Sequence, residues 1–275
     1  MRFTDYAKDG VLSHYFGGGG WSNAGVTGME VALFSSDPTS AGLFTDEITG
    51  LGRQSVTFGA ANQHVITNTN TVTFSTSGWS ASGVVATHLA VINNHSSAPK
   101  ILSYGMLTNS ITISASEDIE IDIDGLAIGF DTNSITQPVT EDYAFPDSVA
   151  DEVLEFVFRP SVATIPAQPT AWELSLHTAV SLDGTQHEWT GPNYSRQAFA
   201  SGWNSVASAS GGFREVTNNG AITFVNQTES PVAMWGVWDS GNNKLLTVND
   251  LVNDLTVISG SSVVFSDQSI SLSID

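Results

Sequence analysis

Hydrophobic and polar positions follow a helical period at two places in the chain and a strand-like period after each of them. Between residues 147 and 158, apolar residues recur at helical spacing behind an acidic first turn; these are Val149, Val153, Leu154 and Val157. Residues 5–16 show a weaker version of the same spacing. A stripe of this kind is typical of one helix face, so the pattern predicts a short helix at both places.

After each predicted helix, short runs rich in Val, Ile, Thr and Phe are separated by Ser, Gly, Asn and Asp, as is typical of strands and turns. In the first half these runs cover residues 29–34, 56–58, 72–74, 84–92, 101–107, 111–113 and 119–130. In the second half they cover residues 172–176, 221–225, 232–238, 245–248, 255–258, 263–265 and 270–274. This density of strands fits a sandwich, a jelly roll or a small barrel, and we favour a jelly-roll-like antiparallel β-sandwich.

The two halves of the chain resemble each other. Matched residues recur at a nearly constant offset: Leu33 and Leu176 at 143, Arg53 and Arg196 at 143, Lys100 and Lys244 at 144, and Phe74 and Phe224 at 150. So small a drift indicates a tandem duplication, with the junction in the polar stretch 131–138. The predicted domains are residues 1–136, a β module with its helix and the glycine-rich linker 17–20, and residues 137–275, a homologous module with its own helix.

Composition narrows the classes of function. The chain has 275 residues, of which 28 are acidic and 8 basic, so its net charge is −20. Few and dispersed cations argue against nucleic-acid binding through phosphates. The absence of cysteine excludes disulfides, thiolate nucleophiles and cysteine-based zinc sites. Because no apolar run reaches the length of a membrane span and the N-terminus lacks an apolar signal core, we expect neither membrane insertion nor a signal peptide.

The clearest alternation is the segment 118–124, in which isoleucines alternate with carboxylates. We interpret it as one half-exposed strand with an acidic outer face. Glu120, Asp122 and Asp124 are weak candidates for holding a divalent cation, because a cation would relieve the repulsion between them. The likeness to a calcium-binding EF-hand loop fails because no helix flanks the segment. The six histidines have no metal-ligand spacing, so we predict no metal site and no cofactor.

Half of the basic residues form two repeat-matched pairs, namely Arg53 with Arg196 and Lys100 with Lys244. The two copies share no histidine or nucleophile at matched positions, which argues against a catalytic arginine. We therefore predict that each guanidinium packs against backbone carbonyls or a carboxylate such as Glu47 or Glu188, with a subunit contact as the alternative.

Tryptophans gather in the second half. Trp235 and Trp238 lie in an apolar run, so we expect them in the core. Trp189, Tyr194 and Trp203 lie in predicted loops and are candidates for a surface that contacts a glycan or a receptor.

Several stretches follow the pattern of a known protein family. In the first half these are Thr4-Asp5-Tyr6-Ala7, Val31-Ala32-Leu33-Phe34 and Arg53-Gln54-Ser55-Val56. In the second half they are Tyr194-Ser195-Arg196-Gln197, Trp235-Gly236-Val237 and Leu272-Ser273-Ile274-Asp275. On these motifs each half resembles a family of small phage virion proteins that are commonly labelled tail fibre or minor structural proteins. The chain departs from the family pattern by carrying two copies and by having Leu51 where the second copy has Tyr194.

The resemblance implies a non-enzymatic structural protein on the exterior of a tailed bacteriophage virion, as a fibre, spike or capsid decoration subunit. Its partners would be other virion proteins of the capsid or tail. We also expect a homo-oligomer. A trimer of two-module chains would present six similar modules, and such a ring could match a pseudo-hexameric surface. The alternative is a host receptor- or glycan-binding module of the tail fibre. A polysaccharide depolymerase is a third hypothesis, but no repeat-matched pair of carboxylates supports it.

Overall fold

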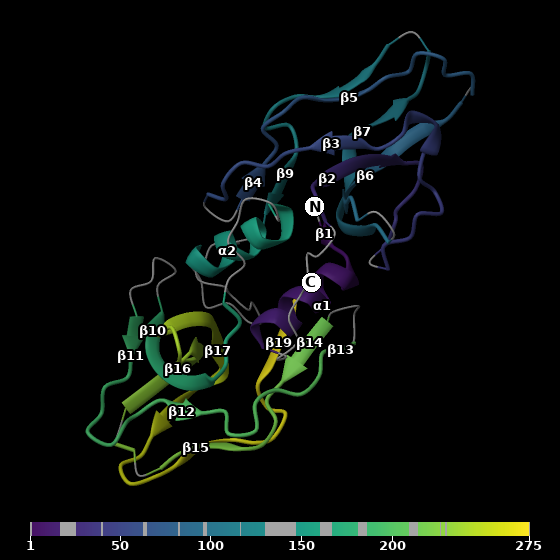
Figure 1. Ribbon diagram of the computed structural model, residues 1–275. Coiled ribbons are helices and arrows are strands. Elements are labelled where there is room, and N and C mark those ends of the chain that lie inside the picture. Colours follow the sequence, from purple (N-terminus) through teal and green to yellow (C-terminus); the bar gives the residue numbers. More distant parts are fainter. Residues whose placement is uncertain are drawn as a thin grey trace.

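Two β units lie on either side of a pair of helices in the computed structural model (Figure 1). The helices are α1 (Asp5–Tyr15) and α2 (Asp147–Phe158), as the spacing of apolar residues predicts. Among the residues described, neither helix is long and apolar enough to cross a membrane. The structure describes residues 2–16, 26–39, 41–62, 65–81, 83–95, 98–115, 117–129, 147–159, 167–180, 186–208, 214–225, 227–228 and 230–274. The glycine run 17–20 and the predicted junction between residues 136 and 137 lie outside them.

The first unit has a large antiparallel sheet in the order β1-β7-β6-β2-β3. Its strands are β1 (Arg2–Phe3), β7 (Lys100–Thr112), β6 (Val85–Asn93), β2 (Met29–Phe34) and β3 (Gln54–Val56). The opposing strands pair as β4 (Val65–Thr67) with β9 (Ala127–Gly129), and β5 (Val72–Phe74) with β8 (Ile119–Ile121). Alternate residues of β2 face opposite sides: Val31 and Leu33 belong to the main core, and Ala32 and Phe34 to a smaller cluster on the outer face.

The second unit repeats this arrangement. Its large sheet has the order β11-β10-β16-β17, with β12 also paired to β10. These strands are β11 (Gln186–Glu188), β10 (Trp172–Val180), β16 (Ser230–Asp239), β17 (Lys244–Val257) and β12 (Gln197–Ala198). The opposing strands pair as β13 (Ala207–Ser208) with β14 (Arg214–Thr217), β14 with β19 (Ser271–Ile274), and β15 (Ile222–Phe224) with β18 (Val263–Phe265). The predicted all-β architecture of two tandem antiparallel modules is confirmed.

Several predicted strands have different bounds in the structure. The predicted runs 101–107 and 111–113 join into the single strand β7, and 245–248 and 255–258 join into β17. Both strands stay paired with a long neighbour, β6 or β16, on either side of a register shift, and the residues at the shift, 107–110 in β7 and 251–254 in β17, bulge out of the ladder. A short 3-10 helix (Thr49–Leu51) precedes β3.

The predicted acidic strand is interrupted. The run 119–130 forms two strands, β8 paired with β5 and β9 paired with β4, and residues 122–126 form a turn between them. Asp124 lies in this turn at φ 62°, a conformation that Asp tolerates better than most residues. Ile123 is 56% exposed. The prediction of one strand with isoleucines on one face and carboxylates on the other is therefore wrong beyond Ile121.

Asn68 holds this turn in place. Its side-chain amide donates to the carbonyl oxygens of Asn70 and Asp122, both at 2.8 Å, and its oxygen accepts from the N–H of Leu126 at 2.8 Å. Asn68 is fully buried, so these bonds replace water that the side chain has lost. Together these bonds turn the chain after β8, so that β8 pairs with β5 and β9 pairs with β4.

Asn218 makes the same set of bonds in the second unit. Its amide donates to Gly220 and Ser266, and its oxygen accepts from Ile270. Gln268 at φ 59° takes the place of Asp124. The matching positions confirm that the duplication extends to the polar interior of the modules.

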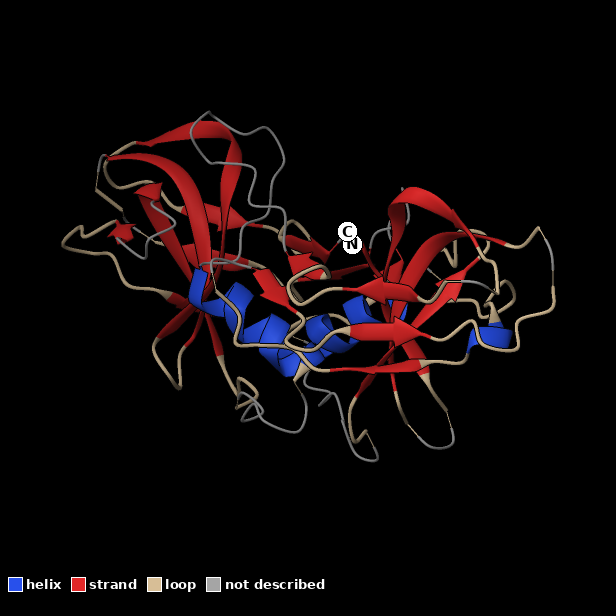
Figure 2. Ribbon diagram, turned by 90° about the horizontal axis from the view of Figure 1, so that it is seen from above, coloured by secondary structure: helices blue, strands red, loops and turns tan. Residues whose placement is uncertain are grey.

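The two helices lie next to each other between the β units, as Figure 2 shows from above. His14 of α1 and Phe156 of α2 pack together with ring centroids 4.7 Å apart. One hydrophobic core cluster includes residues from both helices and from both β units. The helices therefore join the two modules into one packed body.

Candidate functional site

The repeat-matched arginines each form a two-pronged ion pair on the outer side of a large sheet. Arg53 donates from Nε and Nη2 to the two carboxylate oxygens of Glu47, both at 2.8 Å. Arg196 donates from Nη2 and Nε to the carboxylate of Glu188, the shortest contact being 2.7 Å. The guanidinium carbon of Arg196 lies 3.3 Å from the Trp238 ring centroid. The arginines thus contact the two carboxylates named from the sequence.

Electrostatics strengthen these pairs. The hydrogen bond to Glu47 raises the pKa of Arg53 in spite of its partial burial. Burial favours the neutral form of Glu188, but hydrogen bonds from Arg196 and Tyr194 outweigh it and lower the pKa of this carboxyl group. In each pair, the contact with the partner thus favours the charged form of Arg53 or of Glu188.

Beneath the second ion pair lies a buried polar cluster. The Ser175 hydroxyl is 2.6 Å from Nε2 of His177 and accepts a hydrogen bond from the Trp238 indole N–H at 2.8 Å. Burial lowers the pKa of His177 to about 4, so its imidazole is neutral at pH 7. A serine next to a neutral histidine has the composition of a nucleophile and its base. Both side chains have no exposed area, so this arrangement presents no nucleophile at the surface.

The matched lysines lie at the start of β7 and β17. Lys244 forms an ion pair with Glu152 of α2, and the Lys100 ammonium lies 5.7 Å from the Tyr6 ring centroid of α1. Each lysine therefore contacts the helix that precedes its own module.

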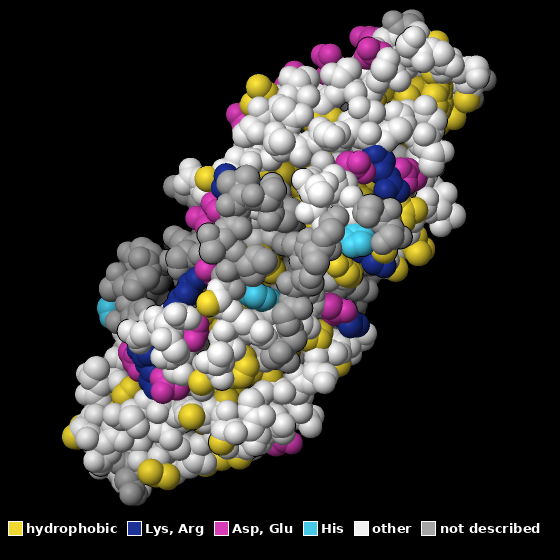
Figure 3. Space-filling model, in the orientation of Figure 1, with side chains coloured by type: hydrophobic (Ala, Val, Ile, Leu, Met, Phe, Trp, Pro, Cys, Tyr) yellow, Lys and Arg dark blue, Asp and Glu magenta, His cyan; other side chains and the backbone are white. Residues whose placement is uncertain are grey.

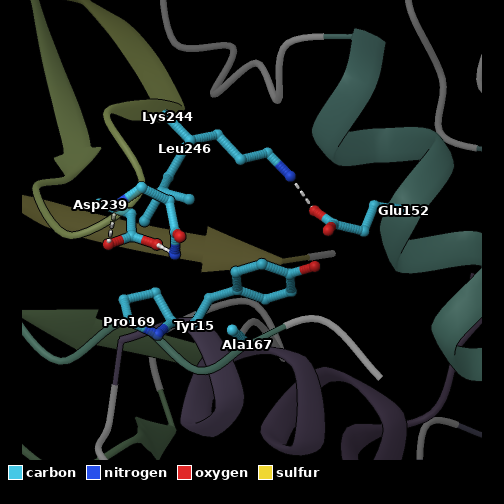
Figure 4. A pocket seen from close by; sticks show the side chains of 8 residues that line it. Tyr15, Glu152, Ala167, Pro169, Asp239, Lys244 and Leu246 are labelled. Atoms are coloured by element: carbon cyan, nitrogen blue, oxygen red, sulfur yellow. Dashed lines mark hydrogen bonds and ion pairs between the residues drawn. The ribbon is translucent and has the colours of Figure 1, made fainter. Parts of the chain in front are cut away.

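A small pocket of about 190 Å³ lies between the helices and the β16–β17 hairpin (Figure 4). It is lined by Tyr15, Glu152, Ala167, Pro169, Asp239, Asn242, Lys244 and Leu246. The ring of Tyr15 enters it from α1, and its hydroxyl is buried. Burial, together with the charge of Glu152, raises the pKa of Tyr15. The pocket is small, and of its three charged residues Lys244 is paired with Glu152, while Asp239 bonds the neighbouring Gly241 and Asn242.

Of the three predicted surface aromatics, Trp189 is buried, and Tyr194 and Trp203 are partly buried against the core. Trp189 is only 7% exposed and packs on Tyr194, which stacks on Phe224. Trp203 stacks on Phe199 with ring centroids 4.5 Å apart. The prediction of an exposed side chain is wrong for Trp189, because its loop folds over the core, whereas Trp203 keeps part of its surface exposed. Trp235 and Trp238 are buried, as predicted.

The acidic residues proposed for a cation do not converge. Asp124 accepts from the Thr67 hydroxyl at 2.6 Å, and Glu120 lies 3.5 Å from the Thr73 hydroxyl. In the described part of the chain, no group of three or more His, Asp or Glu side chains is arranged to hold a metal ion.

Sequence reasoning missed Asn68 and Asn218, although a signal was present. Both precede a matched Thr-Phe pair at the same offset of 150 that links Phe74 to Phe224. An asparagine that recurs in both copies just before a strand indicates a structural turn, because its side chain satisfies backbone groups.

A family model described as Podophage GP4 fiber I protein gp80 matches residues 2–129 and, a second time, residues 144–273. The chain belongs to this fiber I protein family. The two matches confirm the resemblance to phage fibre proteins and the tandem duplication, and a fibre protein is a component of the virion. A comparison with curated proteins finds no match to the chain.

Proposed function

We propose that this member of the fiber I protein family is a non-enzymatic structural subunit on the virion exterior, where it binds other virion proteins of the capsid or tail. The observation that carries the proposal is the family match over both modules. The burial of Ser175 and His177 and the scattered carboxylates support a structural role.

Electron microscopy of purified particles tests the proposal. We expect an antibody against a tag fused to the protein to label fibres at a fixed position on each particle. Label spread over the capsid would indicate a decoration subunit instead. Absence of the protein from purified particles would overturn the virion role.

The non-enzymatic part has a separate test. We expect no release of reducing ends when the purified protein is incubated with capsular polysaccharide of the host. Reproducible release that a heat-treated sample lacks would establish an enzyme.

We further infer a homo-oligomer, with a trimer of two-module chains as the favoured form. Exposed apolar side chains at the β15–β18 end of the second unit support a contact there: Val225, Ile258 and Val264 are 57%, 69% and 57% exposed. Figure 3 shows hydrophobic side chains at this lower end and acidic ones along the upper edge. In a chain of net charge −20, an uncharged surface is where a second copy meets the least repulsion.

Light scattering at micromolar concentration measures the oligomer. Val264→Glu introduces the charge that the first unit has at the matched position, Glu120, and we expect it to shift the mass toward the monomer. Ile123→Glu, at an exposed position of the first unit, is the control. A stable wild-type monomer would contradict the oligomer.

A further inference from the structure

Each helix bridges the two halves of the chain. α1 begins on its own β unit, where the Thr4 hydroxyl donates to the carbonyl oxygen of Ile101 at 2.5 Å, and it ends on the second unit. α2 begins next to its own unit, through the ion pair of Glu152 with Lys244, and ends on the first unit. The C-terminal end of each helix is therefore bound by the other half.

The two helix ends use matched aromatic anchors, Phe16 and Phe158, which lie 142 residues apart and are both buried. The Phe16 ring lies 5.3 Å from the Trp203 ring, and the Trp172 indole donates to the carbonyl of the last residue of α1 at 2.8 Å. The Phe158 ring lies 5.5 Å from the ring of Phe58. Buried aromatic anchors of this kind carry much of the free energy of protein–protein contacts.

The polar contacts of the two helices differ. On α1, Asp9 forms a two-pronged ion pair with Arg214 of the second unit. On α2, Glu155 accepts from the N–H of Ala61 in the first unit at 3.2 Å. At the offset of 142 that links Phe16 to Phe158, the residue of α1 that matches Glu155 is Ser13, so α1 lacks the carboxylate of this contact. The two helices therefore offer different polar groups to the β units that they contact.

We propose that the two halves recognise each other as a heterotypic pair, in which the C-terminal end of each helix is a protein ligand for the other β unit. The partner of each half is thus the other half of the same chain, recognised by an amphipathic helix that ends in phenylalanine. A covalent connection raises the effective concentration of the halves but adds none of these contacts. The proposal concerns the chain itself and does not rest on its place in the virion.

Cleavage of the intact protein tests this directly. A protease site is introduced within residues 131–138 of the full chain, and the purified protein is cut. We expect the two halves to stay together, so that the cut protein keeps the mass of the uncut protein, in which each chain contributes 29.0 kDa, by light scattering at micromolar concentration. Separation of the halves at that concentration would overturn the proposal.

Variants of the anchors show whether the helix ends hold the pair. In the cut protein, Phe16→Ala and Phe158→Ala should each raise the dissociation constant of the halves about 100-fold, because each removes a buried ring. Phe44→Ala, in the outer cluster of the first unit and away from both helices, is the matched control and should leave it unchanged. Equal effects of all three variants would contradict the assignment.

A charge-reversal cycle tests the heterotypic part. Asp9→Arg and Arg214→Asp should each raise the dissociation constant about three- to tenfold at low salt, and the double variant should recover most of the loss. The effect should shrink at high salt because the pair is partly exposed. If the double variant raises the dissociation constant by the product of the two single effects, the pair is not the source of specificity.

Discussion

The outer faces of the two large sheets have matching strand arrangements but carry different side chains. In the first unit this face is apolar, and its buried residues are Ala32, Phe34, Ala90, Ile92, Ile101 and Tyr104. In the second unit, the strand register places Ser175 and His177 opposite Gly236 and Met234, where the first unit has Ala32 and Phe34 opposite Ala90 and His88. The ion pair above this face, Arg–Glu, is the same in both units.

The difference shows how a duplicated module can exchange an apolar cluster for a polar one without changing its backbone. The Ser175 hydroxyl contacts both the His177 imidazole and the Trp238 indole, while Nδ1 of His177 is buried without a hydrogen-bond partner from any residue that the structure describes. Gly236 leaves the space: a Cβ there would lie 2.8 Å from the His177 ring and 2.9 Å from the Ser175 hydroxyl. Ser175 and His177 therefore fit this face because residue 236 has no side chain.

The largest loss of stability is expected at Asn68 and Asn218, which make the same hydrogen bonds in both units. Asn68→Ala and Asn218→Ala should each lower the free energy of unfolding by about 4 kcal/mol, because several buried backbone groups lose their partners. Chemical denaturation measures this, and the partly exposed Asn70→Ala, which removes bonds to the N–H of Thr57 and the carbonyl of Ser55 and is expected to cost about 1 kcal/mol, is the control. A loss below that of the control in either unit would show that the asparagines do not hold the turns.

The pH dependence of stability distinguishes the two outer clusters. His177 has a pKa of about 4 in the folded protein and near 6.5 in the unfolded chain, so the unfolded chain binds a proton that the folded protein does not. The free energy of unfolding should therefore fall by about 3 kcal/mol as the pH drops from 6.5 to 4. The variant His177→Phe, which has the residue of the first unit, should lack this part of the slope. An identical slope in the variant would contradict the buried neutral imidazole.

Exchanging the matched small residues Gly236 and Ala90 tests whether each outer face depends on its own small residue. Gly236→Ala introduces the alanine of the first unit and should destabilise the protein by about 2 kcal/mol, because the new Cβ collides with Ser175 and His177. The reciprocal Ala90→Gly should cost about 1 kcal/mol through backbone entropy. Thermal unfolding of both variants checks the order, and a harmless Gly236→Ala would refute the coupling.

The two arginines should differ in what they contribute. Arg196→Lys loses the two-pronged contact with Glu188, the stacking on Trp238 and the bond to Asn243, so we expect a cost of about 2 kcal/mol. Arg53→Lys should cost only about 1 kcal/mol, because the aromatic contact of Arg53 is looser: its guanidinium carbon lies 4.7 Å from the Phe44 ring centroid. Denaturation midpoints in low salt report both, and the reverse order would contradict the role of the tryptophan.

The smallest expected effects have opposite signs. Gln268→Gly should stabilise the protein by about 0.5 kcal/mol, because glutamine at φ 59° is strained. Asp124→Gly should destabilise it by about 0.5 kcal/mol, since aspartate tolerates this conformation and accepts a bond from Thr67. Equal shifts of the two melting temperatures would show that the turns do not differ in this way.

Much of the fold follows from local patterns. Helical spacing identified both helices, and β-type runs such as 29–34 and 263–265 became strands with the same bounds. The constant offsets revealed the duplication and drew attention to Arg53 and Arg196. These features could be predicted because each is encoded within a few neighbouring residues or in the comparison of one half with the other.

Contacts between distant segments could not be predicted in this way. The alternation of 118–124 indicates a strand, but a side chain about 50 residues earlier, Asn68, turns it away from β5. The loops of Trp189 and Trp203 look like surface, yet the Trp189 ring packs on Tyr194, and the Trp203 ring packs on Phe199 and on Phe16 at the end of α1.

The sequence by itself determined the class of fold, the two modules and their helices, because propensity and periodicity act over short stretches of chain. Only the tertiary structure decided where the helix ends lie, because burial depends on which other segment arrives to cover a surface. The sequence shows that Phe16 and Phe158 are matched apolar residues at the ends of the two helices, but not which module each one contacts. Their position on the opposite modules is a property of the packed molecule.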